Sequence, residues 1–286
     1  MRHFDDIGDD EIRVIGRRHV KHKPLYKRWW VWMIAAVVIV LFAEALMYIM
    51  RSKEVKPSME PYPETTPSVL PPTMAQNGHA TVHVLDTVIN DVPLRLLVPV
   101  NAVPELCLGI PDTTDPSLIL GLQAADIRAD NHGIVGAFVL KGELLSRGVA
   151  KKGFCAILDG IIRLGMAEST SLFEETTDKD GYFFRQYPLV NQGLLVENNP
   201  KNKSFRHSLC ELNGQIVVVS CLDKESFHDF AQALVDLGTQ NAIALTGGLA
   251  YGFIHDSDNG FRSWGGDVRM WGKEPNVNFI VWRVVE

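Results

Sequence analysis

The 286-residue sequence has few cysteines, and their spacing excludes the usual zinc-binding pairs. None of the four lies in a C-x-x-C pair, and none has a His at ligand spacing. Outside the cytoplasm they could form disulfides, and the alternative is that they are small buried side chains; both interpretations stay open. The four are Cys107, Cys155, Cys210 and Cys221.

The sequence also lacks the short motifs of several enzyme classes. It contains no G-x-x-x-x-G-K-[ST], G-x-G-x-x-G, H-E-x-x-H or G-x-S-x-G. Their absence argues against P-loop nucleotide enzymes, Rossmann dehydrogenases, zincin proteases and α/β-hydrolases. The formal net charge of −6 argues against nonspecific nucleic-acid binding. We therefore expect no nucleic-acid partner and no nucleotide cofactor.

Two arrangements resemble metal sites only weakly. His79 and His83 would share one face of an alternating strand, which is as typical of plain sheet surface. The loop Asp256–Gly260, with Asp267 at the twelfth place, has closely spaced oxygens, but its Gly falls at the fifth place rather than the EF-hand's sixth. A polar turn is the favoured interpretation of this loop, and Ca²⁺ binding is the alternative. We expect no resident metal.

Acidic residues are absent from residues 13–28, which carry seven Lys or Arg. The following run, Trp29–Met50, is 22 residues long and has Glu44 as its single charge. As a helix it would extend roughly 33 Å, enough to cross a bilayer. The basic flank favours a cytoplasmic N-terminus and an extracytoplasmic C-terminal part. The sequence thus predicts a basic cytoplasmic tail (1–28) and an uncleaved transmembrane signal anchor (29–50), typical of a single-pass membrane protein with a periplasmic domain.

Residues 51–78 hold six of the 15 prolines and predict an extended stalk. The remaining residues, 79–286, predict one globular domain. Asp159 and Gly160 separate two apolar runs, which is a hairpin signal. A helix is expected after Asp223, taken as its N-cap, with Gly238 as its end. Other expected helices cover residues 169–176 and 116–123; the expected strands cover 79–85, 94–99, 134–140, 154–158, 161–166, 215–221, 241–245 and 279–284.

These elements predict an α+β fold: a mixed β-sheet domain with packed helices, preceded by the transmembrane helix. The strand, helix and strand over residues 215–245 form a βαβ-like unit. The turn Thr246-Gly247-Gly248 follows its last strand, and such a turn is a natural place for a site.

Several segments place charged or amide side chains beside glycines and strand ends. Arg185 and Arg206 are candidates for binding phosphate, because a guanidinium offers a rigid fork of donors. Asp126, Asp130 and Glu168 are the candidate acids and bases, and glycosidic cleavage generally uses two such carboxylates. For each Arg, a surface ion pair is the plainer interpretation. The segments are Ala124–Asn131, Phe183–Gly193, Phe205–Cys210 and Leu245–Phe253.

Together these segments make the chain resemble the phosphodiester glycosidase domain family. Its relatives include the lysosomal uncovering enzyme, N-acetylglucosamine-1-phosphodiester alpha-N-acetylglucosaminidase, and the similarity is greatest to a Bacteroides-type branch described as a domain of unknown function. The resemblance spans about residues 124–283. It is carried by GVAKKGFCAILDG, FFRQYPLVNQG, KNKSFRHSLCELNG, SFHDFAQALVDLGTQNAIALTGG and FIVWR.

The resemblance implies hydrolysis of a sugar-1-phosphodiester in glycan or envelope material. Asp126 and Glu168 are the first choices for its catalytic carboxylates, in place of the family's own Asp. The family's Asp-Gly-Gly is Thr246-Gly247-Gly248 here, and a Thr cannot replace a carboxylate. A noncatalytic glycan- or envelope-binding protein on the same scaffold is therefore the alternative function. The substrate- and phosphate-binding residues would be Arg128, Arg185, Gln186, Arg206, Thr246, Gly247, Gly248 and Tyr251, with Trp264 as a further sugar-stacking candidate.

Overall fold

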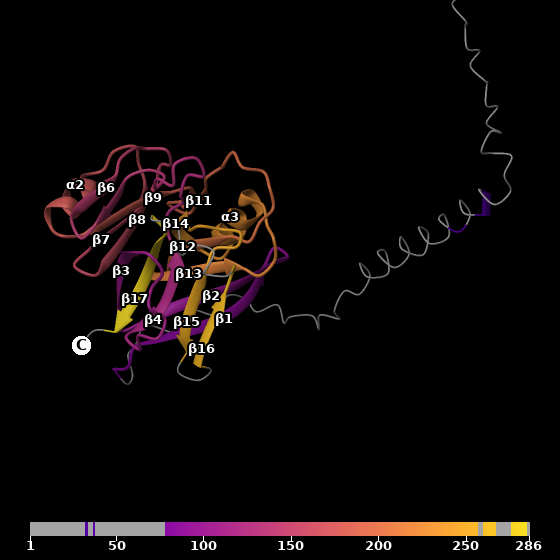
Figure 1. Ribbon diagram of the computed structural model, residues 1–286, viewed down its shortest axis with the longest axis horizontal. Helices are drawn as coiled ribbons and strands as arrows, with labels where there is room; N and C mark the ends of the chain where they lie inside the picture. The colour runs from indigo at the N-terminus through magenta and orange to yellow at the C-terminus, as the bar shows by residue number, and fades with distance from the viewer. Residues whose placement is uncertain (1–31, 34–36, 38–77, 257–259, 267–275, 285–286) are drawn as a thin grey trace, which may run out of the picture. The chain divides into compact units, whose positions relative to one another are not determined.

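The computed structural model describes residues 78–256, 260–266 and 276–284, together with 32, 33 and 37. The chain divides into two compact units, Met1–Pro61 and Tyr62–Glu286. The described part of the second unit contains seventeen strands and two helices (Figure 1). Every pairing between these described strands is antiparallel.

The expected α+β class is therefore wrong: the described domain is mostly β, and its sheets are antiparallel rather than mixed. The expected transmembrane helix has no support either, because no helix among the described residues is long and apolar enough to cross a membrane. Except for residues 32, 33 and 37, the predicted anchor at 29–50 lies outside the described residues. The predicted tail, the stalk up to residue 77 and most of the candidate calcium loop also lie outside them.

The described strands form three sheets. The seven-stranded sheet has the order β1 (Thr81–Ile89), β2 (Val92–Val100), β13 (Gln215–Cys221), β12 (His207–Leu212), β14 (Thr239–Ala244), β10 (Pro188–Asn191), β11 (Leu194–Leu195). One five-stranded sheet has the order β16 (Gly260–Trp264), β15 (Gly252–Asp256), β4 (Leu118–Gln123), β17 (Asn278–Val284), β3 (Ala102–Leu108). The other has the order β6 (Glu143–Ser146), β5 (Phe138–Leu140), β9 (Tyr182–Gln186), β7 (Gly153–Leu158), β8 (Ile161–Met166).

The central strands of the seven-stranded sheet, β2, β13, β12 and β14, are buried on both faces. Alternate residues of a strand point to opposite faces. In β13, Val217 and Val219 therefore pack with helix α3 (Phe227–Asp236), while Val218 packs with residues of the two five-stranded sheets. All three valines are fully buried. The central core thus joins all three sheets.

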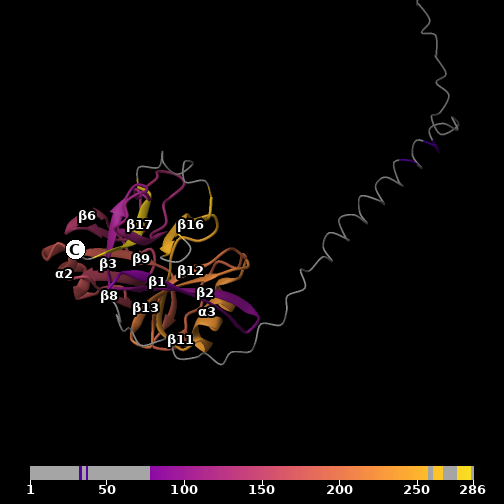
Figure 2. The same cartoon turned by 90° about the horizontal axis from the view of Figure 1, so that it is seen from below.

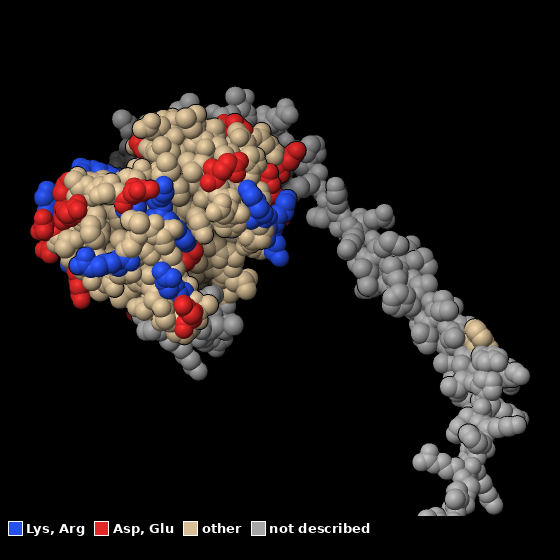
Figure 3. All heavy atoms as spheres, turned by 90° about the horizontal axis from the view of Figure 1, so that it is seen from above, with Lys and Arg blue, Asp and Glu red and all other residues tan. Residues whose placement is uncertain are grey.

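The two helices lie at different sides of this domain (Figures 1 and 2). Helix α2 (Ser171–Asp178) packs on β7 and β9, and α3 packs on β10, β11 and β14. The N-cap of α3 is Ser226, not the expected Asp223, since the Ser226 hydroxyl accepts from the Asp229 N–H. Positively charged and negatively charged side chains are interspersed over the face in Figure 3.

Local predictions succeeded where the signal was a turn. The hairpin at Asp159-Gly160 is confirmed: it joins β7 and β8, and its two residues have φ of 50° and 73°. The helix expected at 116–123 is wrong, because those residues contain strand β4. The βαβ-like unit is formed by β13, α3 and β14, but the antiparallel strand β12 lies between its two strands. The turn after β14 faces the pocket described next.

Candidate functional site

The ends of strands from all three sheets meet around Asp126. This residue follows β4, and Gln186 ends β9 just before the chain enters the seven-stranded sheet at β10. Thr246 follows β14, and its N–H donates to the Ala124 carbonyl oxygen over 3.1 Å. The Asn278 side chain, at the start of β17, accepts from the Ala125 N–H (2.7 Å) and donates to its carbonyl oxygen (3.1 Å). The backbone beside Asp126 is thereby held from two sides.

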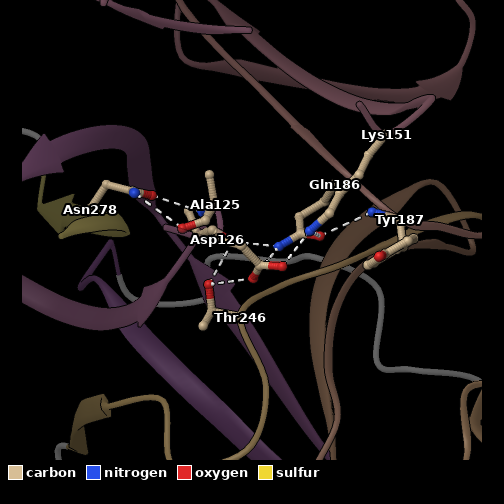
Figure 4. Close-up of polar contacts among 8 residues, drawn as sticks. Ala125, Asp126, Lys151, Gln186, Tyr187, Thr246 and Asn278 are labelled. Atoms are coloured by element: carbon tan, nitrogen blue, oxygen red, sulfur yellow. Dashed lines mark hydrogen bonds and ion pairs between the residues drawn. The ribbon is translucent and has the colours of Figure 1, made fainter. Parts of the chain in front are cut away.

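The Asp126 carboxylate accepts from three side chains (Figure 4). Lys151 Nζ donates to its Oδ2 and forms an ion pair with it. Gln186 Nε2 donates to Oδ1 over 2.8 Å, and Thr246 Oγ1 lies 3.3 Å from the same oxygen. The Asp126 side chain is nevertheless 37% exposed. Asp126 is therefore fixed in position and still open to solvent.

Lys151 lies behind this carboxylate, just before β7, and its side chain is only 5% exposed. Its Nζ also donates to Gln186 Oε1 over 2.7 Å and lies 4.3 Å from the centre of the Tyr187 ring. Burial lowers the pKa of Lys151, while the charge of Asp126 and its hydrogen bond act in the opposite direction. Residue-based reasoning missed Lys151 because a lone Lys carries no spacing signal.

A pocket of about 270 Å³ opens beside Asp126, and we call it the Asp126 pocket. Among the described residues that line it, Asp126 alone carries a carboxylate and Arg206 alone carries a guanidinium. The pocket thus brings together one fixed anionic side chain and one cation. The remaining lining residues are Gln186, Tyr187, Pro200, Asn202, Ser204, His207, Phe227, Ala244, Leu245, Gly247 and Gly248.

Arg206 lines this pocket, and its side chain is held in place by contacts with the protein. Its side chain donates from Nε to the Glu225 carbonyl oxygen over 3.0 Å and from Nη2 to the Asn202 carbonyl oxygen. The guanidinium carbon lies 3.9 Å from the centre of the Phe227 ring. Burial lowers the pKa of Arg206. Arg206 lines the pocket, and no acidic side chain among the described residues forms an ion pair with it.

The other predicted arginines lie elsewhere. Arg185 is buried, and it donates to the carbonyl oxygens of Ala167 (2.6 Å) and Glu168 (2.8 Å). It also donates to the carbonyl oxygens of Lys151 and Lys152, each over 3.4 Å, so it ties two loops together outside the Asp126 pocket. Arg128 is exposed and does not line the pocket.

Glu168 also lies away from Asp126. Its side chain is 72% exposed and pairs with Lys152 over 2.7 Å, and the Lys152 contact lowers the pKa of Glu168. Tyr251 packs against Phe253 and Phe279 rather than lining the pocket. Of the two predicted catalytic carboxylates, only Asp126 reaches the pocket.

The cysteines and metal candidates can be placed as well. All four cysteines have free thiols, and three are buried. Burial raises the pKa of the Cys107 and Cys221 thiols to about 11. Within the described part of the chain, no group of three His, Cys, Asp or Glu side chains is placed to hold a metal ion.

Comparison with known proteins gives a fold relationship and no family membership. No family model matches the sequence, and no curated protein matches it. The zebrafish N-acetylglucosamine-1-phosphodiester alpha-N-acetylglucosaminidase catalytic domain, auto-inhibited by its pro-peptide, has a similar fold with a TM-score of 0.53 and 10% identity. The match covers 73% of this chain and 83% of that one.

A hypothetical protein from Synechocystis is similar to the same degree, with a TM-score of 0.52 and 12% identity. That match covers 72% of this chain and 62% of the Synechocystis chain. These likenesses show that the chain shares a fold with a phosphodiester glycosidase catalytic domain. They do not show the Bacteroides-type branch.

Proposed function

We propose that this chain is a phosphodiester glycosidase-type hydrolase that cleaves a sugar-1-phosphodiester in the Asp126 pocket. The observation that carries the proposal is the placement of Asp126 and Arg206 in one pocket of a fold shared with a phosphodiester glycosidase catalytic domain. In this proposal Arg206 binds the phosphate and Asp126 acts at the anomeric carbon.

Arg206 suits a phosphodiester because its charge has no acidic partner among the described residues. Its contacts with two carbonyl oxygens and with the Phe227 ring hold the guanidinium in one orientation. A fixed guanidinium binds phosphate more strongly than a mobile one, because less side-chain entropy is lost. The Gly247-Gly248 turn adds no side chains beside it, so a ligand can approach the backbone closely.

Asp126 is an acceptor in all three of its side-chain contacts, so it suits the role of nucleophile or base rather than acid. Attack on the anomeric carbon, by Asp126 or by water that it deprotonates, breaks the bond from that carbon to the phosphate oxygen. The bond's electron pair leaves with the phosphate as a phosphomonoester. If Asp126 attacks directly, water then hydrolyses the resulting sugar ester, which frees the sugar and regenerates the carboxylate.

This leaving group accounts for a pocket with a single carboxylate. Ordinary glycosides lose an alcohol and need a general acid to protonate it. A phosphomonoester leaves readily, since the pKa of its second proton is about 6. A second carboxylate such as Glu168 is therefore not required in the pocket.

The test is sugar release by the full chain from a panel of sugar-1-phosphodiesters. We expect release by the unchanged protein, and a loss of about 30-fold or more in kcat/KM for Arg206→Lys, because a charged hydrogen bond to phosphate is lost. Arg163→Lys is the matched control, since Arg163 is exposed on β8 away from the pocket. It should leave kcat/KM unchanged.

Asp126→Asn separates hydrolysis from binding. If the protein is a hydrolase, this variant should still bind the phosphodiester but release no sugar. Binding by the unchanged protein without release from any member of the panel would instead favour the noncatalytic glycan- or envelope-binding protein. Thr246, at the place of the family's Asp, motivates that second candidate.

The extracytoplasmic location of the domain is also a proposal. It rests on the basic residues 13–28, which lie outside the described residues. A C-terminal reporter enzyme that is active only outside the cytoplasm tests it. An inactive reporter on a stably expressed fusion would contradict it.

A further inference from the structure

A second pocket adjoins the Asp126 pocket. Its volume is about 440 Å³, and we call it the Trp264 pocket. His207 and Gly248 line both pockets, so the two cavities meet at these residues. The two pockets are therefore neighbours, with a glycine at their shared boundary.

The walls of the Trp264 pocket are largely hydrocarbon. Its apolar lining comes from β2, β15 and β16 and from the segments that flank β12, β13 and β14. These apolar residues are Leu97, Phe205, Leu222, Leu249, Ile254 and Trp264. The nature of these walls favours an apolar occupant over a sugar or a phosphate.

Arg95, His207 and Ser220, three of the polar residues that line this pocket, already have protein partners. Arg95 forms two hydrogen bonds with the Asp86 carboxylate, of 2.8 and 2.6 Å. His207 Nδ1 lies 2.8 Å from Ser220 Oγ, and burial lowers the pKa of His207 to about 4, so its ring is neutral at pH 7. The boundary with the Asp126 pocket therefore carries a neutral ring and a glycine, and no charged side chain among the described residues lines both pockets.

We propose that the Trp264 pocket binds the apolar alcohol portion of the same phosphodiester, and that the substrate class is a sugar-1-phosphate esterified to an alkyl group. This inference rests on the proposed function, in which Arg206 holds the phosphate next door. With the phosphate at Arg206, the sugar lies toward Asp126 and the alkyl chain passes Gly248 toward Leu249 and Trp264.

The test measures binding of methyl, butyl and hexyl phosphate to the full chain by calorimetry, without any catalytic step. Each methylene that enters an apolar pocket raises the affinity by up to about fourfold. We expect hexyl phosphate to bind at least about tenfold more tightly than methyl phosphate. Equal affinities would overturn the inference and leave the phosphate site of the proposed function intact.

The variant for this test is Leu222→Ser combined with Leu249→Ser. These side chains are 37% and 66% exposed, so replacing them should not disturb folding. The variant should lose most of the preference for hexyl phosphate and keep its affinity for methyl phosphate. Leu194→Ser is the matched control, because Leu194 is 72% exposed and lies outside the pocket.

Unchanged preference in the double variant would also overturn the inference. A chain-length preference that the double variant abolishes, in a protein that hydrolyses no sugar phosphodiester, would support the apolar site and reject the hydrolase. The two proposals can therefore fail separately.

Discussion

The buried ammonium of Lys151 and the half-open carboxylate of Asp126 form an ion pair at the junction of three β-sheets. Lys151 precedes β7, and Asp126 follows β4. Gln186 bridges them, donating to Asp126 and accepting from Lys151. This arrangement makes Lys151 a positioning residue, because it does not line the pocket itself and contacts three residues that do: Asp126, Gln186 and Tyr187.

Removing the carboxylate should destabilise the domain more than removing its lysine partner. Asp126→Asn leaves Lys151 buried without a counter-charge, and we expect the free energy of unfolding to fall by about 1–3 kcal/mol. Adding Lys151→Met should restore part of this loss. Urea denaturation of the single and double variants measures both effects. Glu168→Gln, which breaks the exposed pair with Lys152, should change stability by less than about 1 kcal/mol.

Thr246→Asp should make the stability of the domain depend on pH, because it places a second carboxylate beside Asp126. The Thr246 hydroxyl lies 3.3 Å from Asp126 Oδ1, so a carboxylate there would face a like charge, which raises the pKa of one of the two groups. A raised folded-state pKa lowers stability as pH rises through it. Relative to Thr246→Asn, the Asp variant should lose stability between pH 4 and pH 7. Plots of unfolding free energy against pH that run parallel for the two variants would contradict this.

Gly247→Ala should displace the turn between the two pockets. A Cβ at Gly247 would lie 2.7 Å from the Phe205 carbonyl oxygen, which also accepts from the Gly248 N–H over 2.9 Å. We expect a loss of about 1–3 kcal/mol in unfolding free energy and weaker binding of methyl phosphate. Gly248→Asn is the comparison: its φ of 70° suits Asn, and its nearest neighbour is 3.5 Å away. Gly248→Asn should lower the unfolding free energy by less than Gly247→Ala does.

His207 should make the domain lose stability in mild acid. Burial lowers its pKa from 6.5 to about 4, so the unfolded chain binds a proton in this range that the folded protein does not. Stability should therefore fall as pH drops from 6.5 to 4, by roughly 3 kcal/mol from this group. His207→Gln should make the unfolding free energy less dependent on pH between pH 4 and pH 6.5.

Features set by neighbouring residues could be predicted from the sequence. The Asp159-Gly160 turn selects a hairpin through its positive φ angles, and the apolar spacing after Ser226 selects helix α3. A similar signal at Asn213-Gly214, with φ of 53° and 75°, marks the β12–β13 hairpin, although β12 was not predicted. Strand β4 was mistaken for a helix because it is buried throughout and shows no alternation.

The candidate site was only partly predictable. Asp126, Gln186 and Arg206 were named from segments with charged residues beside strand ends, and all three line the Asp126 pocket. Glu168 was named on the same grounds, but it points to solvent with Lys152. Residue type and spacing do not distinguish the two cases, because exposure depends on which sheets pack together.

The sequence by itself determined the turns, helix α3 and the residue types available for chemistry, because backbone preference and apolar periodicity act over a few residues. Tertiary structure alone decided the antiparallel three-sheet architecture and the pairing of Asp126 with Lys151, 25 positions away. It also decided that the turn after β14 lies between two pockets of different character. Such contacts depend on packing between distant strands, and no local pattern encodes which strand ends will meet.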